Sequence, residues 1–257
     1  MIESQVMEIL RKQFGTRLQE QVSLQKFSTA QVGGNAKWFL KVKNLEELSL
    51  AVILCWEYDI KFFLLGAGSN VLFSDEGFDG LVILNQAKNH KIYQEGNRNY
   101  ISAESGTGLG LIARKAAIAG LSGLEWANTV PGTVGGAVYG NAGAFGDDIK
   151  STLLLAEILQ HGKGKSIWKN EDFQFSYRSS KLKRQQVKGI VLSATFICQP
   201  DDPEKIKERM NSYSEYRRKT QPPGASMGSM FKNPPGDHAG QPPSLPGGTG
   251  MGGHPGQ

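Results

Sequence analysis

The stretch from Pro131 to Gly146 reads Pro-Gly-Thr-Val-Gly-Gly-Ala-Val-Tyr-Gly-Asn-Ala-Gly-Ala-Phe-Gly. Six of its sixteen residues are glycine, and none is charged. This composition does not suit the interior of a helix or strand, because glycine costs conformational entropy and adds no packing. We therefore expect a folded loop whose backbone comes close to another group. Its N–H groups can converge on a phosphate. A glycine-rich turn packed against its own domain is the alternative.

The composition of the 257 residues is that of an ordinary globular protein, with 39% hydrophobic and 21% charged residues. A chain of this length can form one large domain or several smaller ones. No apolar run approaches the length of a membrane span, and the first residues lack the pattern of a signal peptide. We therefore expect a cytoplasmic protein with no membrane partner.

The net charge of +5 does not by itself select a partner. A modest positive balance suits an anionic small molecule as well as RNA, but the sequence has no nucleic-acid motif. We therefore expect no nucleic-acid partner. Cys55 and Cys198 lie in separate apolar segments and are predicted to be small core residues. The sequence has no Cys/His spacing typical of a metal site.

The first part of the chain predicts a strand–helix–strand unit. Apolar residues recur at helical spacing over 2–14, and a strand is expected at 38–42. Asn44 is expected to cap the next helix, with Glu47 completing a capping box. A short buried strand at 62–65 then closes the unit.

The segment Gly66–Asn70, Gly-Ala-Gly-Ser-Asn, follows directly on this last strand. A Gly-x-Gly pair in that position is typical of a phosphate-binding loop, yet it is weak evidence alone. The dinucleotide fingerprint needs a third glycine that opens a helix, whereas 71–74 predicts a strand and 75–80 a turn. The ordinary Rossmann interpretation therefore fails. A further strand at 81–84 is expected to close a first domain near residue 86.

The second part of the chain predicts a mixed domain of helices and strands. It begins with a hairpin that turns at Gly96-Asn97, followed by a helix that Gly120 stops. Two strands are expected to flank a turn that leaves His161 solvated, and a last helix begins at Pro203. The expected ranges are 91–103 for the hairpin, 109–117 for the first helix, 153–160 and 190–197 for the strands, 161–165 for the turn, and 203–213 for the last helix. Ile206, Met210 and Tyr213 are expected to form the buried face of this last helix.

Two short segments are not explained by packing. Phe175–Ser180 precedes a basic run, and Gly228–Pro234 follows a Pro-Pro-Gly turn. Taken separately, Arg178 among aromatic residues suggests a surface cation–π pair. Ser229, taken alone, suggests a local hydrogen bond within a turn.

Six segments together resemble the flavin-dependent UDP-N-acetylenolpyruvoylglucosamine reductases of peptidoglycan synthesis. They occur in the family's order, and the resemblance extends from about Phe27 to Gly240. The short interval between Arg178 and Ser229 resembles the short-loop, type II subgroup. The six segments are Gly33-Gly34-Asn35-Ala36, Gly66–Asn70, Ser74–Gly80, Pro131–Gly146, Tyr177-Arg178-Ser179-Ser180 and Gly228–Pro234.

The resemblance implies an α+β fold. A two-part FAD-binding module of the PCMH/vanillyl-alcohol-oxidase type is followed by an incomplete α/β substrate domain. The implied FAD-binding subdomains are 1–86 and 87–198, and the substrate domain is 199–257. The implied reaction is the NADPH-dependent reduction of UDP-N-acetylglucosamine enolpyruvate to UDP-N-acetylmuramate, with FAD as cofactor and with the UDP-sugar and NADPH as partners. The oligomeric state remains open.

The resemblance also implies roles for individual residues. Arg178 matches the residue that stabilises the enolate on the substrate carboxylate, and Ser229 matches the proton donor. Tyr177, Lys232 and Asn233 match substrate-binding positions. The matching FAD-binding positions are Gly66, Ala67, Gly68, Ser69, Asn70, Gly135, Gly136, Asn141 and Gly143.

The C-terminal end departs from the family's pattern. The family has a catalytic glutamate there, whereas none of the seventeen residues 241–257 is Asp or Glu and ten are Gly or Pro. This composition supports no helix or strand. We hypothesise that 241–257 results from a reading-frame shift or truncation just after Gly240, with a genuine Gly/Pro tail as the alternative. For function, the alternative is an FAD-binding remnant without turnover.

Overall fold

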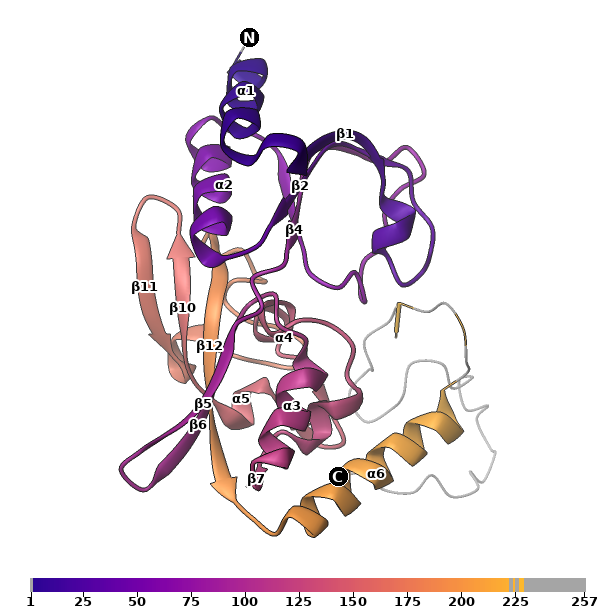
Figure 1. Cartoon of the computed structure of the whole chain (residues 1–257), viewed down its shortest axis with the longest axis vertical. Coiled ribbons are helices and arrows are strands. Elements are labelled where there is room, and N and C mark those ends of the chain that lie inside the picture. Colours follow the sequence, from indigo (N-terminus) through magenta and orange to yellow (C-terminus); the bar gives the residue numbers. More distant parts are fainter. Residues whose placement is uncertain (1, 222–223, 225–226, 229–257) are drawn as a thin grey trace, which may run out of the picture.

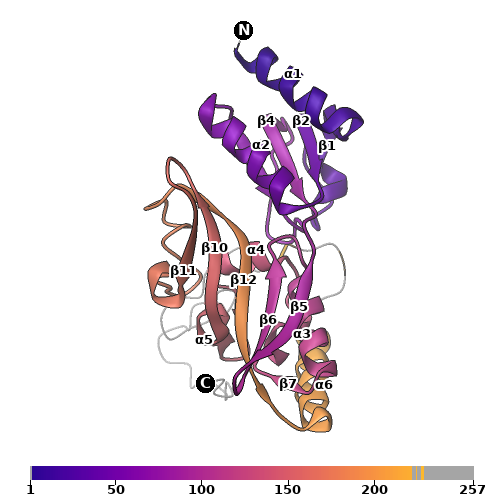
Figure 2. The same cartoon turned by 60° about the vertical axis from the view of Figure 1, so that its left-hand side comes forward.

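The computed structural model of the chain describes residues 2–221, 224, 227 and 228. Figures 1 and 2 show two parts that lie one above the other along the long axis of the molecule. The N-terminal part carries the first strands and helices, and the second part is built on a larger sheet. Each part mixes helices with strands, as the α+β prediction requires.

The N-terminal part is built on a mixed sheet. Its elements are α1 (Ile2–Phe14), η1 (Gly15–Arg17), β1 (Leu18–Ser23), η2 (Leu24–Phe27), β2 (Asn35–Val42), α2 (Leu45–Glu57), β3 (Phe62–Leu65) and β4 (Phe78–Asn85). The strand order is β1-β2-β4-β3, with β2 and β3 parallel to β4 and β1 antiparallel to β2. Because successive side chains point to opposite faces, Leu40 and Ile83 pack with the helices while Phe39 and Val82 form a separate cluster. The predicted strand–helix–strand unit is confirmed.

The start of α2 is capped as predicted, but the reciprocal bond of its capping box forms one residue earlier. Asn44 Oδ1 accepts from Glu47 N at 2.9 Å, and Glu47 Oε2 accepts from Lys43 N at 2.8 Å. Both terminal nitrogens of Arg17 also donate to the Glu47 carboxylate, at 2.6 and 2.8 Å. Chiefly through this pair, the pKa of Glu47 lies below its ordinary value. Glu47 therefore joins α2 to the segment before β1.

The prediction of a strand at 71–74 is wrong, because this segment is a loop. Leu72 is 62% exposed, whereas Phe73 is buried in the cluster of Phe39 and Val82, so the segment packs into this core without pairing as a strand. The Ser74 carbonyl oxygen instead accepts from Gly34 N and Gly77 N, both at 2.9 Å. These bonds join two of the six segments that carry the family resemblance. Conversely, β1 was not predicted, because four of its six residues are polar.

The second part is built on an antiparallel sheet. Its strands are β5 (His90–Glu95), β6 (Arg98–Glu104), β7 (Leu121–Ser122), β10 (Leu153–Gln160), β11 (Gly164–Lys169) and β12 (Gly189–Pro200). The order is β11-β10-β12-β6-β5, and β7 pairs with β12. The β5–β6 hairpin turns at Gly96, which has φ +57°, as predicted. The expected turn at 161–165 is shorter than predicted, because β11 begins at Gly164 and pairs with β10.

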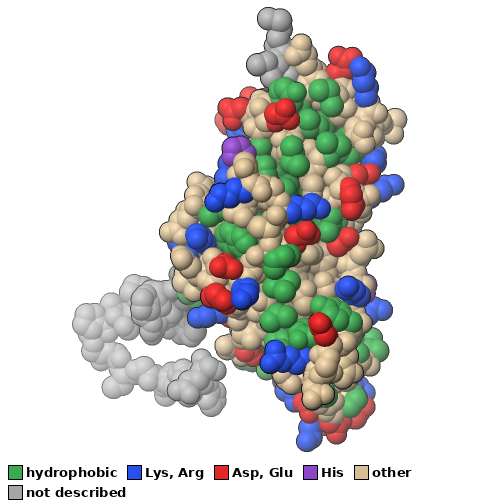
Figure 3. Space-filling model, turned by 90° about the vertical axis from the view of Figure 1, so that its left-hand side faces the viewer, with side chains coloured by type: hydrophobic (Ala, Val, Ile, Leu, Met, Phe, Trp, Pro, Cys, Tyr) green, Lys and Arg blue, Asp and Glu red, His purple; other side chains and the backbone are tan. Residues whose placement is uncertain are grey.

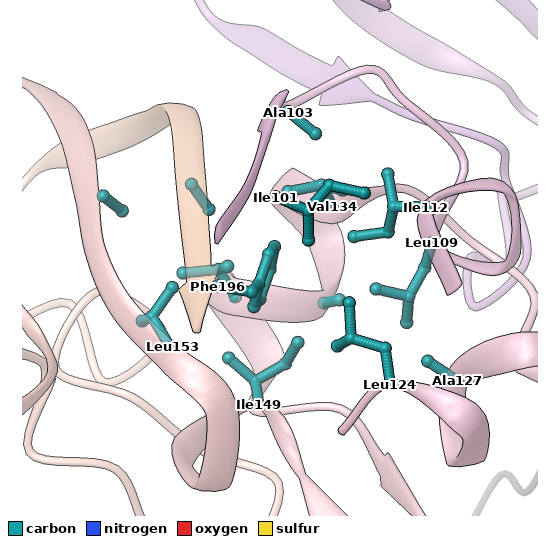
Figure 4. Packing of buried hydrophobic residues seen from close by; sticks show 14 of the residues in the cluster. Ile101, Ala103, Leu109, Ile112, Leu124, Ala127, Val134, Ile149, Leu153 and Phe196 are labelled. Carbon is teal, nitrogen blue, oxygen red and sulfur yellow. The ribbon is translucent and has the colours of Figure 1, made fainter. Parts of the chain in front are cut away.

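Short helices cover the second sheet and complete its core. They are α3 (Leu109–Ile118), η3 (Glu125–Thr129), α4 (Val134–Gly140), α5 (Ile149–Thr152) and η4 (Asn170–Phe173), with a small hairpin of β8 (Gly143–Ala144) and β9 (Asp147–Asp148). Figure 4 shows Val134 of α4, Ile112 of α3 and Phe196 of β12 converging in this core. Leu159, Ile190 and Leu192 instead pack into the core of the N-terminal part, so the two parts share buried apolar contacts.

The long helix α6 (Pro203–Thr220) begins at Pro203 as predicted, with Asp202 as its cap. Ile206 and Met210 are buried, and the helix packs against η3 and α3. The ring of Tyr213 stacks on that of Phe145, with centroids 4.2 Å apart. The predicted buried face of α6 therefore lies against the second part of the molecule.

Charged bonds reinforce this contact. Arg209 Nη2 lies 2.7 Å from Glu125 Oε1 and 2.5 Å from Asp201 Oδ2. Arg217 Nη1 donates to the Thr129 carbonyl oxygen at 2.6 Å, at the end of η3. A cation at a helix C-terminus is favourable, because the last carbonyl groups have no partner in the helix. Burial lowers the pKa of Arg217 from its ordinary value.

Other predicted features of the surface and core can be located. Cys55 and Cys198 are buried as predicted, and burial raises the pKa of each thiol to about 12. His161 is exposed, and its ring meets Trp56 edge-on at 5.4 Å. Within the described residues, no cluster of His, Cys, Asp or Glu could hold a metal ion, and no helix has the length and apolar character of a membrane span. Figure 3 shows acidic and basic side chains interspersed over the face that carries α2 and β11.

Candidate functional site

The loop Gly66–Asn70 leaves β3 and packs closely against the segment that follows η2. Gly68 has φ +66°, and a side chain there would overlap the Phe27 carbonyl oxygen. Glycine is required at this position, because its lack of a Cβ permits both the left-handed conformation and the close approach. Thr29 N donates to Gly68 O at 3.1 Å, and Ser28 Oγ donates to Val71 O at 3.4 Å. This support for the loop was not predicted from the sequence.

The N–H groups of this loop are available to a ligand. In the described part of the chain, none of the N–H groups at 67–70 donates to a protein acceptor. A backbone N–H normally has a hydrogen-bond acceptor. Successive N–H groups without a protein acceptor, in a turn that includes a left-handed residue such as Gly68, can form a concave site for an anion. The loop therefore suits a phosphate group, as the Gly-x-Gly pattern indicated.

The stretch Pro131–Gly146 is only partly the folded loop that we expected. Its centre forms the helix α4, so the prediction that no helix would form there is wrong. Thr133 caps α4, with Oγ1 accepting from Gly136 N at 3.4 Å. Asn141 ends α4 in the left-handed conformation, with φ +47°. The cap at each end compensates for the low helix propensity of glycine.

The N–H groups at the start of α4 already have protein acceptors. Val134 N donates to Thr107 O at 2.8 Å, and Gly135 N donates to Ser105 O at 2.9 Å. A Cβ at Gly135 would lie only 2.7 Å from Ser105 Cβ. The glycine at 135 therefore permits close packing of α4 on the segment after β6. A direct role of Gly135 and Gly136 in binding a cofactor stays a prediction.

The two glycine-rich segments meet at the junction of the two parts of the molecule. A Cβ at Gly66 would lie 2.6 Å from Thr133 Oγ1, so the loop and the start of α4 are in direct contact. Nearby, Asn85 Nδ2 donates to Ser105 Oγ at 2.8 Å across the end of β4. Figure 1 shows α4 just below the N-terminal sheet. The structure thus brings together Gly66–Asn70 and the segment before Gly135, as a shared cofactor site requires.

Asn141 and Gly143 lie beyond the other end of α4. The Asn141 side chain is 2% exposed, and its amide bonds to Asp148, Ser176 and Lys150. Gly143 pairs with Asp148 in the β8–β9 hairpin, where a Cβ would lie 2.5 Å from Asp147 O. Both residues therefore have a visible structural role, and their assignment to the cofactor stays a prediction.

Tyr177 and Arg178 form the tip of a tight turn. The turn is closed by two bonds between Ser176 and Ser179, with N···O distances of 3.1 and 3.0 Å. Tyr177 is 56% exposed, and the Arg178 guanidinium carbon lies 5.8 Å from its ring centroid. This contact is the cation–π pair that the local sequence suggests. It leaves the partly exposed Arg178 able to meet a carboxylate.

The remaining predicted site residues cannot be placed. Ser229, Lys232 and Asn233 lie outside the described residues, as does the segment 241–257. Their assigned roles and the hypothesis of a reading-frame shift stay predictions.

The residues present fit the diphosphate of a cofactor such as FAD. Residues 67–70 offer free N–H groups, and neither 66–70 nor 131–146 contains a carboxylate. A shallow depression elsewhere, beside β2, is lined by Lys37 together with three carboxylates. That excess of negative charge does not suit a phosphate. The three carboxylates are those of Asp75, Glu76 and Asp79.

Comparisons with known proteins identify an FAD-binding domain and a family for this chain. The family model described as FAD binding domain matches residues 36–168. The UDP-N-acetylenolpyruvoylglucosamine reductase of Caldicellulosiruptor saccharolyticus is 41% identical over 221 residues, covering 85% of this chain and 70% of that protein. The enzyme of the same name from Chloroflexus aggregans is 34% identical over 213 residues, covering 82% of this chain and 72% of that protein.

Comparison with solved structures leads to the same family. The crystal structure of the Thermus caldophilus UDP-N-acetylenolpyruvylglucosamine reductase has a TM-score of 0.73 and 35% identity, covering 86% of this chain and 77% of that one. A solvent-stable cholesterol oxidase has a TM-score of 0.54 at 15% identity, which shows a common fold alone. Together with the FAD-binding domain, these matches confirm the predicted two-part FAD-binding module.

Proposed function

Because this chain belongs to the UDP-N-acetylenolpyruvoylglucosamine reductase family, we propose that it uses FAD and NADPH to reduce UDP-N-acetylglucosamine enolpyruvate to UDP-N-acetylmuramate. The structural observation that carries the proposal is the row of free N–H groups at 67–70 beside the cap of α4. These groups would hold the FAD diphosphate. The chemistry that bound FAD supplies is hydride transfer from NADPH to the enolpyruvyl double bond.

The roles of the chain's own side chains follow from the charge that develops on the substrate. Hydride addition to an enolpyruvyl group places negative charge on the adjoining carboxylate as an enolate. Arg178, at the tip of its turn, would stabilise that charge with fixed N–H donors. Ser229 would donate the proton to the neighbouring carbon, with Lys232 supporting the negative charge left on its oxygen. Tyr177 and Asn233 would hold the substrate.

The proposal includes a division of labour along the chain. Residues 1–86 and 87–198 would form the two FAD-binding subdomains, and 199–257 would belong to the substrate domain. The placement of the two sheets on either side of residue 86 supports this division. A cytoplasmic location, where NADPH and nucleotide sugars would be met, also belongs to the proposal. The family comparisons support the reductase function and give no support to the inactive remnant.

A two-step measurement tests the proposed function. The purified protein should be yellow, and acid precipitation should release the flavin, because no His or Cys occurs in either glycine-rich segment for a covalent link. Under anaerobic conditions NADPH should bleach the flavin absorbance, and UDP-N-acetylglucosamine enolpyruvate should restore it. Colourless protein that takes up no added FAD, or bleached protein that this substrate does not reoxidise, would refute the proposal.

The role of Arg178 can be tested against a nearby arginine. Arg184 lies outside the turn but beside it, and its guanidinium donates to Gln174 O at 3.0 Å and to Ser179 Oγ at 3.3 Å. Arg178→Lys should slow reoxidation by the substrate by about 10²-fold, the usual scale for a lost transition-state donor. Arg184→Lys should leave that step within about twofold. Equal slowing in both variants would mean that Arg178 acts only through the fold of the turn.

A further inference from the structure

The turn that carries Arg178 has an unfavourable backbone. Arg178 has φ +53°, in the left-handed region that favours glycine or asparagine. For a side chain of this kind the conformation costs about 1–2 kcal/mol. Such a residue keeps its conformation only where the surrounding structure holds it. The two bonds between Ser176 and Ser179 close the turn, but they do not fix its place relative to the rest of the protein.

One connection runs from the end of α4 to the first residue of the turn. Asn141 Nδ2 donates to the Ser176 carbonyl oxygen at 3.2 Å and to Asp148 Oδ2 at 2.8 Å. Asn141 Oδ1 accepts from Lys150 N at 3.0 Å. Both amide hydrogens and the carbonyl oxygen of this buried side chain therefore have protein partners. Its hydrogen bonds join α4 and α5 to the Arg178 turn.

A second connection runs from the residue after the turn back to α4. Ser180 is completely buried, and its Oγ donates to the Tyr139 carbonyl oxygen at 2.6 Å. The last carbonyl groups of a helix lack partners within it, so Ser180 satisfies one of them. The same Oγ accepts from Lys183 N at 3.2 Å, which fixes the start of the following segment. The turn is thus attached to the end of α4 on both sides.

We propose that Asn141 and Ser180 are positioning residues that set the place of the Arg178 guanidinium for the substrate. This inference rests on the proposed function of Arg178. It gives the α4 segment two tasks at opposite ends, since its start contacts the candidate phosphate-binding loop and its end holds the Arg178 turn. A small displacement of a catalytic group can lower a rate by about 10²-fold, so two hydrogen bonds can have a large effect.

The test uses Asn141→Gly in the full chain. Glycine tolerates the left-handed conformation of position 141, so this variant removes the amide without adding backbone strain. The matched control is Asn170→Ala. Asn170 Nδ2 likewise donates to two carbonyl oxygens, of Lys150 and Leu153, both at 2.8 Å, but does not reach the turn.

Two measurements are made on each variant. The first is hydrogen exchange of the Ser176 and Ser179 amides in the protein alone, which needs no turnover. Asn141→Gly should speed this exchange about 10-fold, the equivalent of one net hydrogen bond, while Asn170→Ala leaves it unchanged. The second is the rate of the two half-reactions. Asn141→Gly should slow reoxidation by the enolpyruvyl substrate about 10²-fold more than it slows reduction by NADPH.

Each result decides a separate claim. Unchanged exchange at Ser176 and Ser179 would overturn the attachment, whether or not the wild type turns over. Faster exchange with equal slowing of both half-reactions would overturn the positioning role. A wild type that never reduces the substrate would refute the proposed function, whereas the exchange result would still decide the attachment. If Asn141→Gly does not fold, the same two measurements are made on Ser180→Ala, which removes the hydrogen bond to the Tyr139 carbonyl oxygen. Ser180→Thr keeps a hydroxyl group and should restore the wild-type exchange and rates.

Discussion

The loop Gly66–Asn70 and the start of α4 are both rich in glycine and touch each other, yet their backbones are used differently. In the loop, the N–H groups at 67–70 have no acceptor among the described residues. At the start of α4, Val134 N and Gly135 N donate to Thr107 O and Ser105 O. Glycine in the first region leaves donors open to a ligand. Glycine in the second lets one backbone pack closely on another.

This difference shows that glycine content alone does not identify a phosphate-binding loop. A glycine-rich segment binds an anion only where its donors are left without protein acceptors. On this criterion, we propose that the loop, rather than the start of α4, would supply the principal contacts to the FAD diphosphate. The start of α4 supports the loop by packing against it, through the contact between Gly66 and Thr133.

The largest expected effect comes from a methyl group in the loop. In Gly68→Ala the new Cβ would overlap the Phe27 carbonyl oxygen, so the loop must move and its N–H groups lose their arrangement. FAD affinity should fall by about 10²-fold or more, measured by flavin fluorescence titration. Gly96→Ala is the matched control. Gly96 has nearly the same left-handed φ, +57°, with nothing within 4 Å of a Cβ.

The control separates backbone strain from the overlap. Gly96→Ala should cost about 1 kcal/mol of stability and leave FAD affinity unchanged. If both variants lost FAD equally, general destabilisation rather than the loop would explain the loss.

A smaller effect is expected at two neighbouring glycines of α4. In Gly135→Ala the Cβ would lie 2.7 Å from Ser105 Cβ, and we expect destabilisation by about 1–3 kcal/mol. In Gly136→Ala the nearest atom is Thr133 Oγ1 at 3.6 Å, an ordinary contact. That variant should instead be more stable by about 0.5–1 kcal/mol, because alanine favours the helix. Urea unfolding of both proteins measures the difference, and destabilisation of the same size in both would contradict the packing role.

Several elements could be predicted from the sequence because their secondary structure depends on residues that are close together in the chain. The strand at 62–65, the capping residue Asn44 and the hairpin turn at Gly96 depend on neighbours in the chain, and each was found where predicted. The two glycine-rich segments were also identified, although the sequence did not reveal that one contains a helix. The caps that permit α4, at Thr133 and Asn141, act through geometry rather than composition.

Contacts between distant residues could not be predicted in this way. Nothing near Gly68 in sequence indicates the carbonyl group of Phe27, and nothing near Asn141 indicates Ser176. The strands β1 and β11 were missed for a related reason, because each becomes a strand by pairing with a neighbour in a sheet. The roles assigned to Arg178 and Ser229 came from the family resemblance rather than from such patterns.

The smallest expected effect is a loss of stability at acidic pH. It should arise at α6 and not at the glycine-rich segments. Burial would raise the pKa of Glu125, but bonds from Arg209, Gly123 and Ser122 outweigh it, so the pKa lies below the ordinary 4.5. A lowered carboxyl pKa stabilises the fold above the ordinary value, and this stability is lost as the pH falls through the folded-state pKa. Acid should therefore loosen the contact of α6 with η3 through Glu125.

Thermal unfolding followed from about pH 6 down to about pH 3, below the ordinary pKa of 4.5, tests this effect. The wild type should lose melting temperature as the pH falls, and Arg209→Gln should lose less, because its Glu125 no longer has the guanidinium partner. FAD affinity should stay level over the same range, since neither glycine-rich segment carries a carboxylate or histidine. An equal acid response in both proteins would show that this ion pair does not control the attachment of α6.

The most direct measurement compares the amides of the two glycine-rich regions before and after FAD is added. In isotope-labelled protein, the amide hydrogens at 67–70 should exchange rapidly without FAD and become protected, with shifted resonances, when it binds. Those of Val134 and Gly135 should already be protected without FAD and change little, because they donate to Thr107 O and Ser105 O. New protection at Val134 and Gly135, with the amides at 67–70 unchanged, would contradict the assignment of the diphosphate to the loop.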